Sequence, residues 1–185
     1  MTDVATRAPR APETAEQYIA RLERALGSRD ALDVLGGTAG ELERVTADLS
    51  DAQLGMPEGP GLWSIRQVIQ HLADSELVVG FRIRMVLAHD RPALAAYDQV
   101  LWTERLHYDK VNVKSALADF KQLRGSTLRL LRLTAPDDRD RVGLHSERGE
   151  ESITQMILNQ AGHDIVHLQQ IARIRKAIGM PNDSS

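Results

Sequence analysis

Two histidines near the end of the chain have the spacing of a metal-binding pair. His163 and His167 lie in the stretch NQAGHDIVHLQQIARI, residues 159–174, which has a strongly helical composition. Residues four apart lie on one face of an α-helix, one turn above the other. The same face is continued by apolar residues, which are Ile153, Met156, Ile157, Ile171, Ile174 and Ile178. The pair therefore interrupts a stripe that should face the protein interior.

His71 is the third candidate ligand, because it lies near the edge of the apolar side of a second predicted helix, in the stretch IQHLADSE. If the two helices pack together, three imidazoles converge. Three neutral nitrogen donors with an open fourth position form the ligand set of a catalytic zinc site, and they also suit nickel, iron or manganese. A single inward histidine is more often a hydrogen-bonded core residue. However, an unsatisfied buried polar group costs ~1–3 kcal/mol, and one shared cation satisfies several such groups at once.

Three further residues are candidates for catalysis beside the metal. Glu76 is the inward carboxylate best placed to handle a substrate or a proton, with a buried hydrogen-bond partner as the simpler interpretation. Asp164 is either an acceptor for an imidazole N–H or a surface carboxylate. His145, in the loop before the last helix, is within reach of the site or is a solvated loop residue.

The stretch HDIVH has the histidine spacing of the H-E-x-x-H metalloprotease motif. Asp164 stands where that motif has glutamate, and no third ligand follows at the metzincin spacing. A metalloprotease is therefore not expected.

The composition limits the classes of protein to consider. The chain has 185 residues, of which 42% are hydrophobic and 26% charged, as in one ordinary globular domain. Its net charge of -3 gives no reason to expect nucleic acid as a partner. The absence of cysteine excludes disulfides, thiolate ligands and a cysteine nucleophile, so any thiol chemistry must use a thiol brought by a substrate. No stretch predicts a signal peptide or a membrane span, so we expect a cytoplasmic protein with no membrane partner.

Helical periodicity positions the candidate ligands. Four long amphipathic segments are predicted, at residues 28–49, from Ile65 to the break before Pro92, from Val113 to before Pro136, and from Ser152 to Gly179. Short helices are predicted before the first of these, ending near Gly27, and within the crossover at residues 93–109. The pairs Ser64/Gln67 and Ser152/Gln155 have capping-box spacing and mark two helix starts.

These segments predict an all-α protein, most simply a four-helix bundle. Nothing alternates with period two for long enough to build a sheet, and residues 137–151 are expected to be a surface loop with room for a hairpin-like turn. We predict one domain at residues 13–180, with a flexible tail at residues 1–12 and another at residues 181–185.

Two stretches together resemble the DinB/YfiT-like superfamily: GPGLWSIRQVIQHLADSE and, well downstream, GHDIVHLQQI. The resemblance extends from about residue 33 to residue 179. It implies a bacterial four-helix bundle that binds a metal through one histidine of the second helix and an H-x-x-x-H pair of the last. By position, the ligands it implies are His71, His163 and His167.

The activities that this resemblance implies are varied. Relatives include thiol transferases that use bacillithiol or mycothiol and a mycothiol-dependent maleylpyruvate isomerase, while many members have no known activity. We predict a metal-dependent thiol S-transferase that activates a low-molecular-weight thiol for attack on a small electrophile, with zinc as the first choice of metal. The alternatives are a hydrolase that uses a metal-bound water and a non-catalytic, metal-binding stress-response protein. A homodimer is a further expectation.

Overall fold

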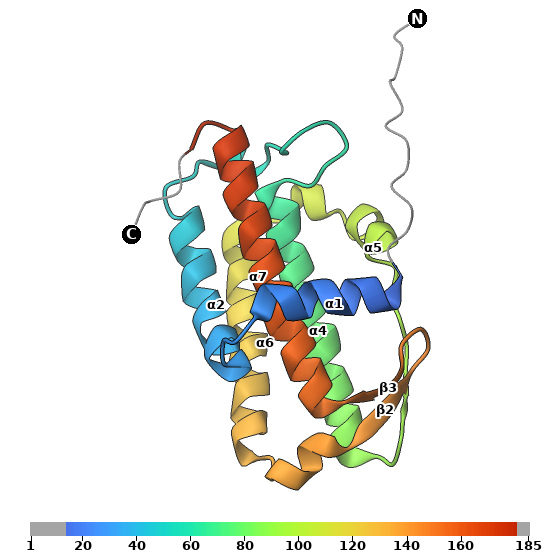
Figure 1. Cartoon of the computed structure of the whole chain (residues 1–185). Helices are drawn as coiled ribbons and strands as arrows, with labels where there is room; N and C mark the ends of the chain where they lie inside the picture. Colours follow the sequence, from blue (N-terminus) through green and yellow to red (C-terminus); the bar gives the residue numbers. More distant parts are fainter. Residues whose placement is uncertain (1–13, 181–185) are drawn as a thin grey trace, which may run out of the picture.

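The computed structural model describes residues 14–180, so the tails predicted at residues 1–12 and 181–185 lie outside the described residues. Four long helices run side by side along the molecule (Figure 1). They are α2 (Ala31–Thr46), α4 (Ile65–Ala88), α6 (Val113–Leu133) and α7 (Ile153–Ala177). The predicted four-helix bundle is therefore confirmed.

The order of the helices around the bundle differs from their order in the chain. α4 and α2 each pack against both α6 and α7, so α2 lies diagonally opposite α4, and α6 opposite α7. The predicted short helix before the first long one is α1 (Ala15–Leu26), which lies across the outer side of α7 (Figure 1). The predicted crossover helix is α5 (Gln99–Arg105). The shorter elements α3 (Asp51–Leu54), η1 (Tyr108–Lys110) and η2 (Pro136–Asp140) complete the helical part.

Side-chain caps fix where the two ligand-bearing helices begin. At the start of α4, the Ser64 side chain accepts from the Gln67 N–H, and the Gln67 side chain accepts from the Ser64 N–H. At the start of α7, the Ser152 side chain accepts from the Gln155 N–H. Because a cap sets the first residue of a helix, it also sets which residues of that helix face inward.

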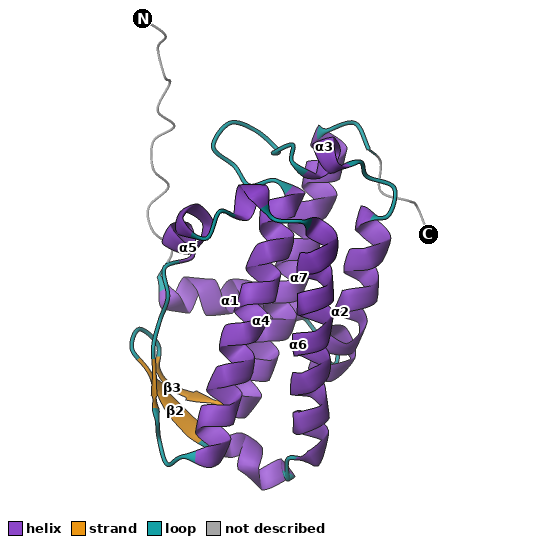
Figure 2. Ribbon diagram, turned by 180° about the vertical axis from the view of Figure 1, so that it is seen from behind, coloured by secondary structure: helices purple, strands orange, loops and turns teal. Residues whose placement is uncertain are grey.

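A small sheet lies at one end of the bundle (Figure 2). Its strands are β1 (Ala93–Leu94), β2 (Val142–His145) and β3 (Gly149–Ser152), with β1 parallel to β2 and β2 antiparallel to β3. The hairpin-like turn expected within residues 137–151 is present. The expectation that the chain builds no sheet is wrong in this detail, because the hairpin recruits β1 from the crossover.

The crossing of α1 over α7 is unusually close. A Cβ on Gly162 would collide with the carbonyl oxygen of Leu22, so only glycine lets the two backbones approach this far. Gly162 directly precedes His163, and the contact therefore holds α1 over the candidate metal ligands. Among the described residues, no helix combines the length and the apolar character needed to cross a membrane.

Candidate metal centre

The three predicted ligands lie together inside the bundle. α4 supplies His71 and α7 supplies His163 and His167, and each offers a ring nitrogen within 4.8 Å of those of the other two. The Nε2 atoms of His71 and His163 are only 3.0 Å apart. His71 and His163 are buried and His167 is half-buried. This geometry is compatible with a single ion shared by three imidazoles.

Burial keeps the three imidazoles neutral. It lowers the pKa values of His71 and His163 well below their usual range, and the neighbouring rings of the cluster lower them further. Burial also lowers the pKa of His167 to about 4, against the opposing effect of its hydrogen bond to Gln170. A neutral imidazole has a free nitrogen lone pair, which a metal ligand requires.

Two ring nitrogens of the cluster have no hydrogen-bond partner among the described residues. His71 Nδ1 and His163 Nδ1 are buried and make no hydrogen bond to any described residue. By contrast, His167 Nδ1 lies 2.8 Å from Gln170 Oε1. An amide oxygen can only accept, so Nδ1 carries the proton and the lone pair of His167 lies on Nε2. The donor set, three neutral imidazoles with unsatisfied nitrogens, fits zinc and its first-row neighbours.

Trp63 covers the histidine cluster. Its ring centroid is 5.1 Å from that of His71 and 6.5 Å from that of His167, with the latter pair nearly parallel at 14°. From its place before the Ser64 cap, the sequence predicts only a role in helix-entry packing. The structure adds contact with two of the three candidate ligands.

Glu76 and Asp164 lie in a second buried group, centred on Arg124 of α6, which we call the Arg124 cluster. Arg124 Nε donates to Glu76 Oε2 at 2.8 Å, and its Nη1 and Nη2 donate to the two Asp164 oxygens at 2.7 and 3.2 Å. Nη1 also donates to the Leu35 carbonyl oxygen at 2.9 Å, so this one guanidinium joins all four long helices.

The Arg124 cluster decides between the interpretations that the sequence leaves open. Asp164 is fully buried, so the surface interpretation is wrong, and its hydrogen bonds come from Arg124. Glu76 has the buried hydrogen-bond role that was the simpler interpretation. Burial raises the pKa of Glu76, with Arg124 opposing, while Asp164 and Glu76 raise the pKa of Arg124 against the effect of burial.

His145 ends β2 and is 4% exposed, so it is not a solvated loop residue. Its Nδ1 accepts from the Glu147 N–H at 3.2 Å, and its buried Nε2 has no partner within the described chain. Burial lowers the pKa of His145, as do the nearby Arg148 and Arg82. No described contact joins His145 to the three histidines of the candidate centre.

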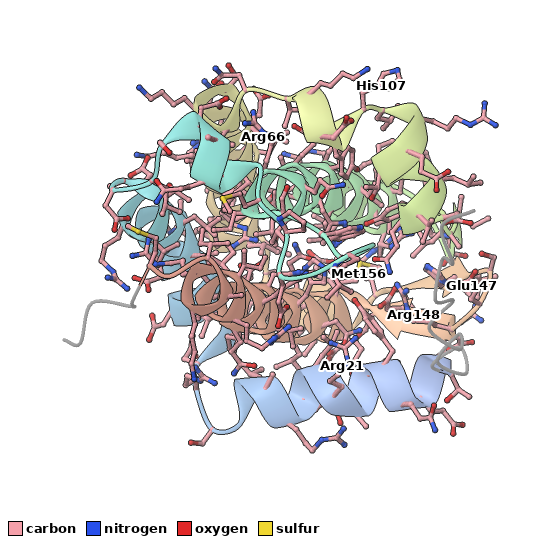
Figure 3. The ribbon with its side chains drawn as sticks, turned by 90° about the horizontal axis from the view of Figure 1, so that it is seen from above. Arg21, Arg66, His107, Glu147, Arg148 and Met156 are labelled. Atoms are coloured by element: carbon pink, nitrogen blue, oxygen red, sulfur yellow. The ribbon has the colours of Figure 1, made fainter. Side chains whose placement is uncertain are left out.

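Two cavities meet at His163. The smaller, which we call the inner chamber, has a volume of about 90 Å³ and includes His71, His163, Arg82, Arg148, Glu151 and Gln160 in its lining. The larger, which we call the outer cleft, has a volume of about 450 Å³ and includes Trp63, His163, His167, Arg21, Glu58 and Arg173. Figure 3 shows Arg21 on α1, at the outside of the bundle. Arg148 and Met156, which line the inner chamber, lie on the bundle side of α1 in the same view. Both cavities therefore border the candidate centre.

Fold and site together define a class of protein, a four-helix bundle with a buried cluster of three histidines. Residues 35–171 match the model of the DinB superfamily, and the chain belongs to this superfamily. It is 32% identical over 135 residues to a protein of Oceanobacillus iheyensis, covering 73% of this chain and 78% of the other. It is 29% identical over 147 residues to YfiT of Bacillus subtilis, covering 77% and 82% of the two chains. Both relatives are provisionally named metal-dependent hydrolases.

A solved structure supports the fold. The structure of YfiT from Bacillus subtilis, described as a probable metal-dependent hydrolase with an unusual four-helix bundle topology, matches with a TM-score of 0.75. The match covers 94% of each chain at 24% sequence identity. The bundle, including the diagonal placement of helices that follow one another in the chain, is therefore a known architecture.

Proposed function

We propose that this protein is a metal-dependent enzyme in which His71, His163 and His167 hold one divalent transition metal, with zinc as the first choice. The observation that carries the proposal is the buried cluster of three neutral imidazoles whose ring nitrogens lie within 4.8 Å of one another. The provisional names of the relatives, which state metal dependence, support it. When bound, such an ion supplies the positive charge that favours deprotonation of a water or a thiol.

The side chains around the centre favour a thiol as the nucleophile. Glu76 and Asp164 are both bound to Arg124. Of the carboxylates that line the two cavities, Glu151 pairs with Arg148 at 2.8 Å and Glu58 lies 3.6 Å from Arg173. The described part of the site therefore offers no unpaired carboxylate as a general base. A thiol needs less help than water, because its ordinary pKa is about 8.5 and that of water about 15.7.

The reaction proposed first is therefore S-transfer from a low-molecular-weight thiol to a small electrophile. The chain contains no cysteine, so the sulfur comes with a substrate. The outer cleft, with a volume of about 450 Å³, is within the range of small-molecule sites. Trp63 and the aliphatic part of Arg173 offer apolar surface there, while Gln170 fixes the ring of His167.

Hydrolysis is the second candidate, and the names of the relatives favour it. It would use the same three histidines and the same cavities, with water in place of the thiol. Both reactions place the nucleophile beside His163.

A paired assay separates the candidates. Metal-loaded protein is supplied with a low-molecular-weight thiol and a chlorinated aromatic or an epoxide, and in parallel with a panel of esters and amides. We expect conjugation by the wild type, none by the His71→Gln/His163→Gln variant, and unchanged conjugation by His89→Gln, which alters an exposed histidine outside both cavities. Ester or amide turnover without conjugation would assign a hydrolase, and neither activity with one bound metal per chain would assign a non-catalytic metal-binding protein.

A further inference from the structure

The inner chamber contains buried N–H groups that have nothing to donate to. Arg82 Nε, Arg148 Nε and Gln160 Nε2 are all buried and without a hydrogen-bond partner in the part of the chain that the structure describes. Arg82 is 6% exposed and Gln160 is 5% exposed. All three residues line the same cavity, and all three atoms are donors only. An unsatisfied buried donor is costly, so the chamber requires an acceptor.

The chamber also has an excess of positive charge. Arg148 Nη2 donates to Glu151 Oε2 at 2.8 Å, and Glu151 Oε1 accepts from Asn159 at 3.1 Å, so this pair is neutral overall. Arg82 has only a neutral hydrogen-bond partner among the described residues, the carbonyl oxygen of Ala95. Glu147 lies further out on the hairpin turn than Arg148 (Figure 3) and does not line the cavity. Glu151 and Glu147 attract Arg82 electrostatically, but no described hydrogen bond joins either of them to it. The charges that line the chamber still sum to one positive charge, which one negative charge would neutralise.

We propose that the inner chamber binds the carboxylate group of a small substrate through Arg82, Arg148 and Gln160. Its role in a reaction rests on the proposed metal centre, while the binding itself does not. The volume of about 90 Å³ is that of roughly three waters. It therefore suits a carboxylate with one or two further carbons better than a sugar or a nucleotide.

The charges favour a carboxylate over a phosphate. Two guanidinium groups and one carboxylate, Glu151, give the chamber lining a net charge of one, which a monoanion matches. A phosphate dianion would leave a net negative charge and would be repelled by Glu151. Guanidinium groups also match the planar fork of a carboxylate.

The position of the chamber orients the bound molecule. His71 and His163 form part of its wall, so a carboxylate held at Arg82 places the carbons attached to it toward the candidate metal centre. The outer cleft reaches the same His163 and is about 450 Å³ in volume. The smaller reactant is therefore the carboxylate, and the larger reactant enters from the outer cleft.

Carboxylate binding can be measured on the full chain stripped of metal, with acetate as the probe at pH 7 and constant ionic strength. We expect saturable binding of acetate by calorimetry or NMR, no binding of acetamide, its neutral isostere, and weaker binding of inorganic phosphate. Arg82→Met should weaken acetate binding at least ~10-fold, because a charged hydrogen bond is lost. Arg66→Met is the matched control, since this guanidinium also binds a backbone carbonyl but lies far from Arg148 (Figure 3), and it should leave acetate binding unchanged.

Several results would overturn the proposal. They are the absence of saturable acetate binding by the wild type, equal binding by Arg82→Met, and tighter binding of phosphate than of acetate. If Arg82→Met does not fold, Gln160→Met removes one donor without removing charge and should weaken acetate binding several-fold. Because no metal is present, a failure here would leave the metal centre untouched, and a failure to bind metal would leave this result standing.

Discussion

The histidine cluster and the Arg124 cluster are two buried polar groups built on the same two helices. α4 supplies His71 to one and Glu76 to the other, and α7 supplies His163 to one and its neighbour Asp164 to the other. In the Arg124 cluster, the guanidinium and the carboxylates bind one another. In the histidine cluster, the Nε2 atoms of His71 and His163 face one another and their Nδ1 atoms have no partner among the described residues, while His167 Nδ1 is bound to Gln170.

This difference distinguishes a structural role from a ligand-binding role better than burial does, because both clusters are buried. A buried polar group whose partners belong to the chain stabilises one arrangement of the helices. A buried polar group without such a partner costs free energy unless a ligand supplies it. By this criterion Asp164 has a structural role, as has Glu76 through Oε2, although Glu76 Oε1 has no partner among the described residues. The three histidines, Arg82 and Gln160 are the proposed ligand sites.

The largest effect expected is from Arg124→Met. It leaves Glu76 and Asp164 as buried carboxylates without a counterion, which should lower the free energy of unfolding by about 3–5 kcal/mol. Urea denaturation measures this loss. The control is Lys121→Met, which breaks the exposed pair with Glu43 and should cost less than about 1 kcal/mol. Equal losses for the two variants would contradict a structural role for the Arg124 cluster.

Gly162→Ala should have the next largest effect. The added Cβ meets the backbone of α1 at Leu22, so α1 must shift away from α7. We expect a loss of about 1–3 kcal/mol in unfolding free energy and faster proteolysis within α1. Gly36→Ala is the matched control, because a Cβ there meets open space within α2, and it should stabilise by about 0.5–1 kcal/mol. If Gly162→Ala were as stable as the wild type, the close crossing would not be needed to hold α1.

The stability of the metal-free protein should depend on pH through the histidine cluster. The pKa of His167 is about 4 in the folded protein, and those of His71 and His163 are also lowered. In the unfolded chain these groups titrate near pH 6.5. Between pH 6.5 and about 4 the unfolded chain therefore binds more protons, and stability falls as the pH falls. Urea midpoints across this range measure the slope, which should be shallower in the His71→Gln/His163→Gln/His167→Gln variant; an unchanged slope would contradict the assignment.

The smallest effect expected is from His163→Leu in the metal-free protein. The change removes an imidazole whose Nδ1 has no partner in the described residues, and the polar contact that is lost is that of its Nε2 with His71 Nε2 at 3.0 Å. We expect the free energy of unfolding to change by less than about 1 kcal/mol, or to rise. A loss as large as that of Arg124→Met would mean that the histidine cluster stabilises the fold without a ligand, which would contradict the difference between the two clusters.

Much of the fold could be predicted from the sequence because its signals are local. The Ser64/Gln67 and Ser152/Gln155 pairs act within one helical turn, and both start helices as predicted. The pairing of Ala93 with Leu144 could not be predicted, because a strand of two residues has no period and its partner lies far later in the chain. The close contact at Gly162 could not be predicted either, because it depends on where α1 crosses α7 and not on the local sequence.

The site was predictable to a different extent. The spacing of His163 and His167 is a local signal, whereas His71 was reached from its place near the edge of an apolar face, and the family resemblance then supported it. Arg124 was missed, because a charged residue is not expected on the buried face of a helix. The signal was present, since Arg124 follows Phe120 by four residues and precedes Leu131 by seven, which places it on the buried stripe. A charged residue within an apolar stripe indicates a buried polar group, as the histidine pair does.

Metal analysis tests the central claim most directly. Wild-type protein purified without an affinity tag, and again after reconstitution with zinc, nickel, iron or manganese, is measured by inductively coupled plasma mass spectrometry beside the His71→Gln/His163→Gln/His167→Gln variant. The account predicts one transition-metal ion per wild-type chain and none in the variant, with both proteins folded. A wild type that takes up no stoichiometric metal under any of these conditions, or a variant that keeps it, would contradict the three-histidine centre.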